Sequence, residues 1–156
     1  MTLFKRPSRR RPSWRMVILA LSVGALGACS STAQSTYNVA QEQAIAAQTL
    51  HFKAINPKIS MATAYGDRSV GEHGTFGKFA ANFITPDHTH TGAYHGVVLK
   101  GVMTNPFKGE KNPPKLTAGS YWYVPAGMDH ATACVSDTPC EFYFHADGPF
   151  DFLPTQ

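Results

Sequence analysis

The sequence lacks a hydrophobic run long enough to form a lasting membrane span. Its extended apolar stretch, Met16–Ala28, is shorter than the roughly 20 residues that a spanning helix needs. Charge is also scarce, since Asp, Glu, Lys and Arg make up 15% of the chain. Six of the 14 basic residues precede Met16, whereas all 10 acidic residues follow it, so the remainder carries a net charge of about −2. Without a Lys or Arg cluster there, we expect no nucleic-acid binding.

The N-terminal segment has the layout of a secretory signal peptide. A basic stretch, residues 1–15, precedes the apolar stretch Met16–Ala28. The segment ends in Leu26-Gly27-Ala28-Cys29, which resembles a bacterial lipobox, where small residues admit the signal peptidase and the cysteine thiol accepts the lipid. The alternative is a plain signal peptide with an unrelated cysteine. Because Ser30 rather than Asp follows Cys29, the resemblance implies a lipid anchor on the periplasmic side of the outer membrane.

Composition divides the chain into three parts. We expect a signal peptide over residues 1–28, a small polar tether over 29–38, and a single folded domain over 39–156. The domain begins with "VAQEQAIAAQTL", Val39–Leu50, which is rich in Ala and Gln and contains no Gly or Pro. This composition predicts one short N-terminal helix.

From Phe52 onward, the pattern changes to that of β-strands. Gly and Pro recur every few residues, and short β-branched, aromatic or alternating runs such as "GVVLKGVM" and "EFYFHA" lie between them. Short strands separated by turn signals predict an all-β sandwich or barrel. The stretch Asn105–Gly119 is too rich in Pro, Gly and Lys for a strand, so we expect a long surface loop.

Two cysteines besides Cys29 lie close together in the sequence "CVSDTPC". Cys134 and Cys140 flank a Ser-Asp-Thr-Pro segment that is typical of a hairpin tip, which would bring the two thiols together. An exported protein folds where disulfides can form. The sequence therefore leaves two alternatives open, a disulfide between Cys134 and Cys140 or two packed, reduced thiols.

Histidines carry the strongest chemical signal. In a strand, residues two apart share a face, so His88 and His90 in "HTH" can present two imidazoles to one point. Neutral imidazole is the commonest metal ligand in proteins, but two from one strand need a third ligand from elsewhere. His130 is the candidate, because the turn that Pro125 and Gly127 favour can deliver it at the start of a following strand.

The two histidine segments together resemble the cupin superfamily. Its first motif, G(x)5HxH(x)3-4E(x)6G, is matched at His88, His90 and Gly101. Its second, G(x)5PxG(x)2H(x)3N, is matched at the following residues: Gly119, Pro125, Gly127 and His130. The resemblance implies a cupin-type β-barrel or jelly roll. It is strongest to small single-domain bacterial cupins without an assigned reaction, related to the cupin domain of zinc-binding anti-sigma factors such as ChrR.

Three positions depart from the cupin motifs. Asn82 replaces the first glycine and Cys134 replaces the final asparagine. The metal-binding glutamate is missing, and its place falls to Tyr94 or to His95, depending on the count. Strand parity favours Tyr94 on the same face as His88 and His90, whereas a bulge at Gly92 would turn His95 inward as a fourth ligand.

The loss of the glutamate changes the chemistry that the resemblance implies. Three neutral histidines leave the full charge of a divalent metal uncompensated, so the site should favour a small anionic ligand. We expect one divalent transition metal, Fe(II) or Zn(II) first and Mn or Ni next. The resemblance makes a non-haem metal dioxygenase the leading hypothesis. One alternative is a non-catalytic module that binds or senses a metal or a small ligand. Another is isomerisation or cyclisation of a carbohydrate or polyketide without redox chemistry, which would need an acid or base at the pocket.

Further residues are candidates for acid-base or substrate-binding roles. Tyr94, His95 and His145 are the titratable side chains that the pattern sets near the predicted site. Their positions follow from strand counting alone. Because cupins often pair through their sheets, the resemblance also implies a homodimer.

Overall fold

The computed structural model describes residues 43–156, so the predicted signal peptide, the lipidation site Cys29 and the tether lie outside the described residues. Within residues 43–50, the described part of the helix predicted over Val39–Leu50, only Ala47–Thr49 (η1) is helical, as one turn of 3-10 helix. None of its residues is buried, so no core contact offsets the cost of nucleating a longer helix. Over residues 43–50 the predicted helix is therefore wrong.

The rest of the described chain consists of strands and loops. The strands are β1 (Lys53–Asn56), β2 (Ile59–Gly66), β3 (His73–Phe79), β4 (Phe83–Ile84), β5 (His88–Thr89), β6 (Tyr94–Lys100), β7 (Met103–Thr104), β8 (Tyr121–Val124), β9 (Ala133–Cys134), β10 (Cys140–Ala146) and β11 (Leu153–Pro154). All pairings are antiparallel. The predicted all-β fold is confirmed, and the predicted loop Asn105–Gly119 contains none of these strands.

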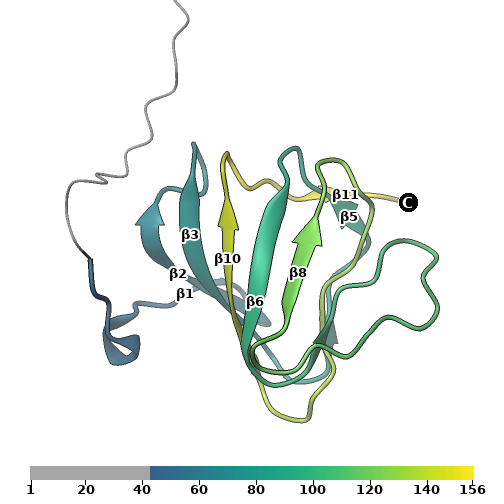
Figure 1. The fold of residues 1–156 in the computed structure, drawn as a ribbon, viewed down its shortest axis with the longest axis horizontal. Helices are drawn as coiled ribbons and strands as arrows, with labels where there is room; N and C mark the ends of the chain where they lie inside the picture. The colour runs from purple at the N-terminus through teal and green to yellow at the C-terminus, as the bar shows by residue number, and fades with distance from the viewer. Residues whose placement is uncertain (1–42) are drawn as a thin grey trace, which may run out of the picture. The chain divides into compact units, whose positions relative to one another are not determined.

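One wall of the fold is a six-stranded sheet in the order β1-β2-β3-β10-β6-β8. Figure 1 shows β10, in yellow, between β3 and β6, which are distant from it in sequence. Side chains alternate along β10, where Cys140, Phe142, Phe144 and Ala146 are all buried and the residues between them are half-buried. This alternation gives the sheet an apolar inner face and a second face toward solvent.

The opposite wall is built from shorter strands. β4, β9 and β7 form a three-stranded sheet, and β11 pairs with β5 near the C-terminus. Buried residues of both walls, including Val98, Met103 and Phe142, form one hydrophobic cluster between them. His88 of β5 is buried, so this wall also places a polar side chain in the interior.

Among residues 43–156, no helix is long and apolar enough to cross a bilayer.

Candidate metal centre

His88 and His90 enter the interior from the same short segment. His88 lies in β5 and His90 directly follows it, with 3% and 2% of their surfaces exposed. Their ring centroids are 4.8 Å apart. The predicted same-face pair is thus present, and both imidazoles lie inside the barrel.

Backbone hydrogen bonds bring His130 to this pair. The His88 N–H donates to the His130 carbonyl at 2.9 Å, and the His130 N–H donates to the His88 carbonyl at 3.0 Å. The turn before His130 is also attached to the pair, because the Gly127 N–H donates to the His90 carbonyl at 2.8 Å. Gly127 has a φ of +70°, a conformation that glycine adopts without steric cost.

The first motif glycine is replaced by a residue that meets the same backbone requirement. Asn82 has a φ of +53°, and it is the one non-glycine residue with positive φ in the described part of the chain. Asn tolerates this left-handed conformation better than most residues. The substitution therefore preserves the positive φ that the turn requires.

The three histidines form one compact group. One ring nitrogen from each of His88, His90 and His130 lies within 4.8 Å of the others, and all three residues are buried. They are the one such group of His, Cys, Asp and Glu found among residues 43–156. These nitrogens are close enough to bind a single ion.

Backbone carbonyls hold the other ring nitrogen of each histidine. Nδ1 of His88 bonds to the Pro86 carbonyl at 2.8 Å, Nδ1 of His130 bonds to the Met128 carbonyl at 3.0 Å, and Nδ1 of His90 bonds to the Asp151 carbonyl. A carbonyl only accepts, so each Nδ1 carries the proton and each Nε2 keeps its lone pair. Fixing the tautomer from behind in this way is typical of histidines that bind metals.

Burial keeps the three rings neutral. It lowers the pKa of His90 to about 4, and it lowers the pKa of His88 and of His130 as well. The charged form of an imidazole is disfavoured when it leaves water, which is the cause of these shifts. At neutral pH the Nε2 lone pairs are therefore free of protons, as a metal ligand requires.

One of these nitrogens has no partner. Nε2 of His90 is fully buried and makes no hydrogen bond, a costly arrangement for a polar atom in a protein interior. A bound cation would satisfy it. The donor set, three neutral imidazoles with fixed tautomers, fits Fe(II), Zn(II), Mn or Ni without selecting among them.

Tyr94, not His95, faces the histidine group. Tyr94 is 4% exposed, and its hydroxyl donates to Nε2 of His130 at 3.1 Å. Burial raises the pKa of Tyr94 to about 12, so the phenol stays protonated. His95 lies on the outer face, exposed, where Nδ1 hydrogen bonds with the Tyr121 hydroxyl. The hypothesis of His95 as a fourth ligand is wrong, because no bulge at Gly92 reverses the strand parity.

His145 also lies on the outer face. It pairs in register with His95 across β10 and β6. Nδ1 of His145 hydrogen bonds with the Tyr65 hydroxyl at 2.7 Å, and Nε2 bonds with the Asp147 carboxylate at 2.8 Å. The sequence interpretation of His145 as a residue near the site is therefore wrong.

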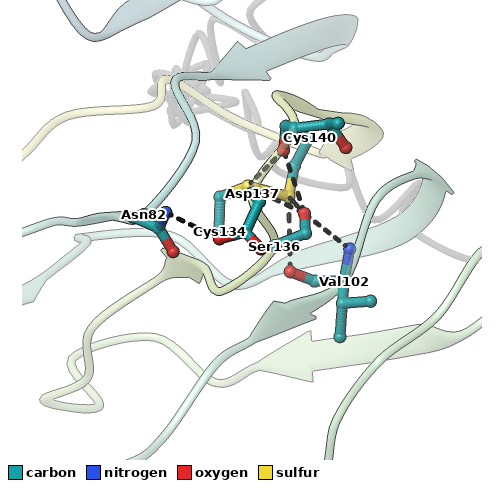
Figure 2. Close-up of a disulfide and its surroundings, with 7 residues drawn as sticks. Asn82, Val102, Cys134, Ser136, Asp137 and Cys140 are labelled. Carbon is teal, nitrogen blue, oxygen red and sulfur yellow. Dashed lines mark hydrogen bonds between the residues drawn. A yellow bond between two sulfur atoms is a disulfide. The ribbon is translucent and has the colours of Figure 1, made fainter.

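Cys134 and Cys140 form a disulfide within the buried hydrophobic cluster (Figure 2). Both cysteines are buried, and Cys134 has no surface on the histidine cavity. The loop between them is also attached by hydrogen bonds, from the Asn82 side-chain amide to Asp137 at 3.2 Å and from the Val102 N–H to the Ser136 hydroxyl at 3.2 Å. Of the two alternatives in the sequence, the structure has the disulfide.

The sequence analysis missed the contribution of the C-terminal segment. Phe150 stacks on His90 with ring centroids 4.1 Å apart, and Phe152 stacks on His88 at 4.2 Å. The alternation in "FDFLP", which sends both phenylalanines to one side, was the available signal. Sequence alone did not indicate that this segment pairs with β5.

A cavity of about 60 Å³ lies against two of the histidines. It has room for about four water-sized groups. The lining is mostly aromatic and aliphatic, and it includes His88, His90, Tyr94, Trp122, Thr132 and Phe144. A small molecule in this cavity would contact the histidines with little competing water.

Comparison with known families gives one match. Residues 39–156 match the family described as "Domain of unknown function (DUF4437)". None of the curated proteins matches this sequence.

Solved structures show the same fold at low sequence identity. The polyketide cyclase RemF from Streptomyces resistomycificus is similar at a TM-score of 0.63 and 15% identity, covering 74% of this chain and 87% of that one. An RmlC-like cupin from Shewanella frigidimarina has a TM-score of 0.56 and 18% identity, covering 69% and 92%. The complex of Rhodobacter sphaeroides SigE with the anti-sigma factor ChrR has a TM-score of 0.52 and 14% identity, and the match covers 65% of this chain and 52% of that one. The predicted cupin-type jelly roll is confirmed.

The structures with this fold include several kinds of enzyme. Besides the cyclase, they include an oxalate oxidase and DMSP lyases, each at or below 17% identity. At such identity the likeness establishes the fold and leaves the reaction to the residues of the site.

Proposed function

The chain belongs to the DUF4437 family, and we propose that it is a metal-dependent cupin enzyme in which His88, His90 and His130 bind one divalent transition metal. The reaction we propose is that of a non-haem dioxygenase acting on a small anionic substrate. The observation that carries the proposal is the buried, unpartnered Nε2 of His90 beside two imidazoles of the same fixed tautomer.

The residues around the three histidines support an open site rather than a closed structural one. A structural zinc site has four protein ligands, whereas a catalytic site keeps at least one position for substrate or water. His95 faces outward and Cys134 is in a disulfide, so neither can complete a four-ligand sphere. A bound metal would supply Lewis acidity and, as Fe(II), a centre for reaction with O2.

The charge and shape of the cavity support an anionic substrate. The histidines and Tyr94 are neutral, so no side chain among them offsets the charge of a divalent ion. An anionic group of the substrate, such as a carboxylate, enolate or thiolate, would do so. The Tyr94 hydroxyl, which now donates to His130, is the nearest phenolic donor for orienting that group.

The aromatic wall contributes by excluding water. Phe150 and Phe152 stack on two of the histidines and separate them from solvent. In such a dry site, hydrogen bonds and charge interactions with the substrate are stronger than in water. The small cavity favours a reacting group of only a few non-hydrogen atoms.

Metal analysis followed by oxygen consumption tests this proposal. Protein purified without chelator should contain close to one metal ion per chain by mass spectrometry. The Fe(II)-loaded protein is then screened for O2 uptake with small β-dicarbonyl, phenolic and thiol compounds. Bound metal without turnover of any compound, but with anion-dependent changes in stability, would favour the alternative of a binding or sensing module. Absence of stoichiometric metal would refute both.

We also propose that Cys29 carries a lipid that anchors the domain to the periplasmic side of the outer membrane. The support is the lipobox-like Leu26-Gly27-Ala28-Cys29 after a basic and apolar leader. In cells fed a radiolabelled fatty acid, the protein should become labelled and fractionate with outer membranes. Cys29→Ser should abolish the label, and labelling of this variant would contradict the proposal.

A homodimer through the sheet is the oligomeric state we propose. Leu99, Tyr121 and Tyr123 on β6 and β8 are 46%, 56% and 45% exposed, which leaves large apolar side chains on the outer face. Light scattering should give twice the chain mass, and Tyr121→Asp should reduce it to the mass of one chain. A monomer in the unaltered protein would refute this part of the proposal.

A further inference from the structure

A second cavity adjoins the one at the histidines. It measures about 480 Å³ and is mostly apolar in lining. The two cavities share five of their lining residues, which are Ile59, Met61, Thr85, Phe150 and Phe152. These side chains therefore form the partition between an inner space at the histidines and an outer groove toward solvent. Phe152 is 45% exposed, so the partition reaches the surface.

Arg68 lines the outer groove from the loop between β2 and β3. One hydrogen bond holds its backbone directly, and another closes the turn in which it lies. The Phe150 N–H donates to the Arg68 carbonyl at 2.8 Å, and the turn around it is closed by the Val70 N–H, which donates to the Asp67 carbonyl at 3.1 Å. The backbone of Arg68 is thus attached to the same C-terminal segment that covers the histidines.

Arg68 attracts the neighbouring Asp67 carboxylate without forming a close ion pair with it. The Asp67 carboxylate accepts hydrogen bonds from the backbone and hydroxyl of Ser69, and Asp151 accepts them from the backbone and hydroxyl of Thr91. Among residues 43–156 the ion pairs within 4.0 Å do not include Arg68. It is also the one arginine after Arg15. Arg68 is half-buried and lines an apolar groove, and its guanidinium is well suited to bind a carboxylate there.

From this arrangement we propose that Arg68 is a specificity-determining residue that binds a second anionic group of the substrate. The substrate class is a dianionic organic acid with an apolar middle. One anionic end lies at the histidine group, the apolar part crosses Ile59, Met61 and Phe150, and the far carboxylate pairs with Arg68. The position of the first anionic group, at the histidines, rests on the proposed function. The position of the second anionic group, at Arg68, is argued from the residues that line the groove.

The test compares a dicarboxylate with a monocarboxylate of the same chain length. Binding of suberate and of octanoate to the full-length, Zn(II)-loaded protein is measured by calorimetry for the unaltered chain, Arg68→Gln and Arg68→Lys. The matched control is Lys58→Gln, which removes an exposed cation lining a different groove. Adipate and sebacate are included to find the chain length that spans the two ends.

Arg68→Gln should weaken binding of the best dicarboxylate about tenfold and that of octanoate less than twofold, because a single charge-assisted pair is lost. Arg68→Lys should retain part of the affinity, and Lys58→Gln should change neither ligand. Equal weakening of suberate and octanoate, unchanged suberate affinity in Arg68→Gln, or no binding of any dicarboxylate would overturn the inference. Zinc content, measured on the same samples, reports separately on the proposed function.

Discussion

The two faces of the six-stranded sheet carry the same residue types in opposite circumstances. On the inner face, Tyr94 of β6 contacts the buried histidine group that faces the sheet, and Nε2 of His90 in that group has no partner. On the outer face, His95 is exposed and bonded to Tyr121, while Nδ1 and Nε2 of His145 bond to Tyr65 and Asp147. Tyr94 and His95 are neighbours in sequence, yet they belong to the two different environments.

This contrast shows that residue type does not identify the site. The outer histidines have hydrogen-bond partners on their own face. The inner ones are held by backbone carbonyls on one side, and the opposite side keeps an accepting nitrogen in a dry interior. The inner face is a candidate metal centre because it holds a buried imidazole nitrogen, Nε2 of His90, that can bind a cation and has no hydrogen-bond partner.

Removing an inner ligand should have the largest effect. We expect His90→Ala to lower Zn(II) affinity more than a thousandfold, because a three-ligand site becomes a two-ligand site. The outer-face control His95→Ala should retain the metal content of the unaltered protein. Competition with a zinc chelator measures both. Equal affinities for the two variants would remove the distinction between the faces.

His73, on the inner face, should make the stability of the protein depend on pH. It is fully buried, and burial lowers its pKa to about 4. In the unfolded chain the His73 imidazole binds a proton near pH 6.5, whereas in the folded chain it does so only near pH 4. The neutral, buried His73 therefore stabilises the fold fully above pH 6.5, and this contribution is lost progressively as the pH falls toward 4. The loss at pH 4 should amount to about 3 kcal/mol.

Urea unfolding from pH 7.5 to pH 4 measures this dependence. In His73→Leu, which cannot titrate, the fall in unfolding free energy between pH 6.5 and 4 should be smaller than in the unaltered protein. Parallel curves for the two proteins would contradict the assignment. Losses below pH 4 belong instead to carboxylates such as Asp151, whose hydrogen bonds from Thr91 lower its pKa.

The disulfide tests how far the inner face depends on a covalent link at one end. Cys140 is the first inward residue of β10, and it closes a short loop with Cys134. Replacing both cysteines by alanine should lower the free energy of unfolding by about 2 kcal/mol. Thermal unfolding with and without reductant measures this, and only the unaltered protein should respond to the reductant.

The Tyr94 hydroxyl should have the smallest effect, confined to ligand binding. Tyr94→Phe should leave zinc content unchanged and weaken acetate binding to the zinc-loaded protein about tenfold, the equivalent of one hydrogen bond to a charged group. The outer-face counterpart Tyr121→Phe should bind acetate normally. An unchanged acetate affinity in Tyr94→Phe would show that the phenol does not contact the anion.

Much of the fold and site followed from local sequence patterns. Short strand-like runs predicted an all-β sandwich or barrel, and the resemblance to the cupin motifs implied the cupin-type barrel. The same-face pair of His88 and His90, with His130 after the Pro125–Gly127 turn, predicted the cluster, because strand parity and turn chemistry are local properties. Parity also favoured Tyr94 over His95. The predicted N-terminal helix was wrong over residues 43–50, because propensity without a buried face does not sustain a helix.

The sequence by itself determined the strand periodicity, the turn residues and the set of histidines available, since these depend on neighbours a few positions apart. Tertiary structure alone decided which nitrogens are left unsatisfied, that the C-terminal Phe150 and Phe152 cover the histidines, and that Arg68 lies at an apolar groove. Those features arise from contacts between segments that lie far apart in the sequence. Examples are the pairing of β11 with β5 and the hydrogen bond between His90 and Asp151. Local pattern carries no information about such contacts, because they form only when the barrel closes.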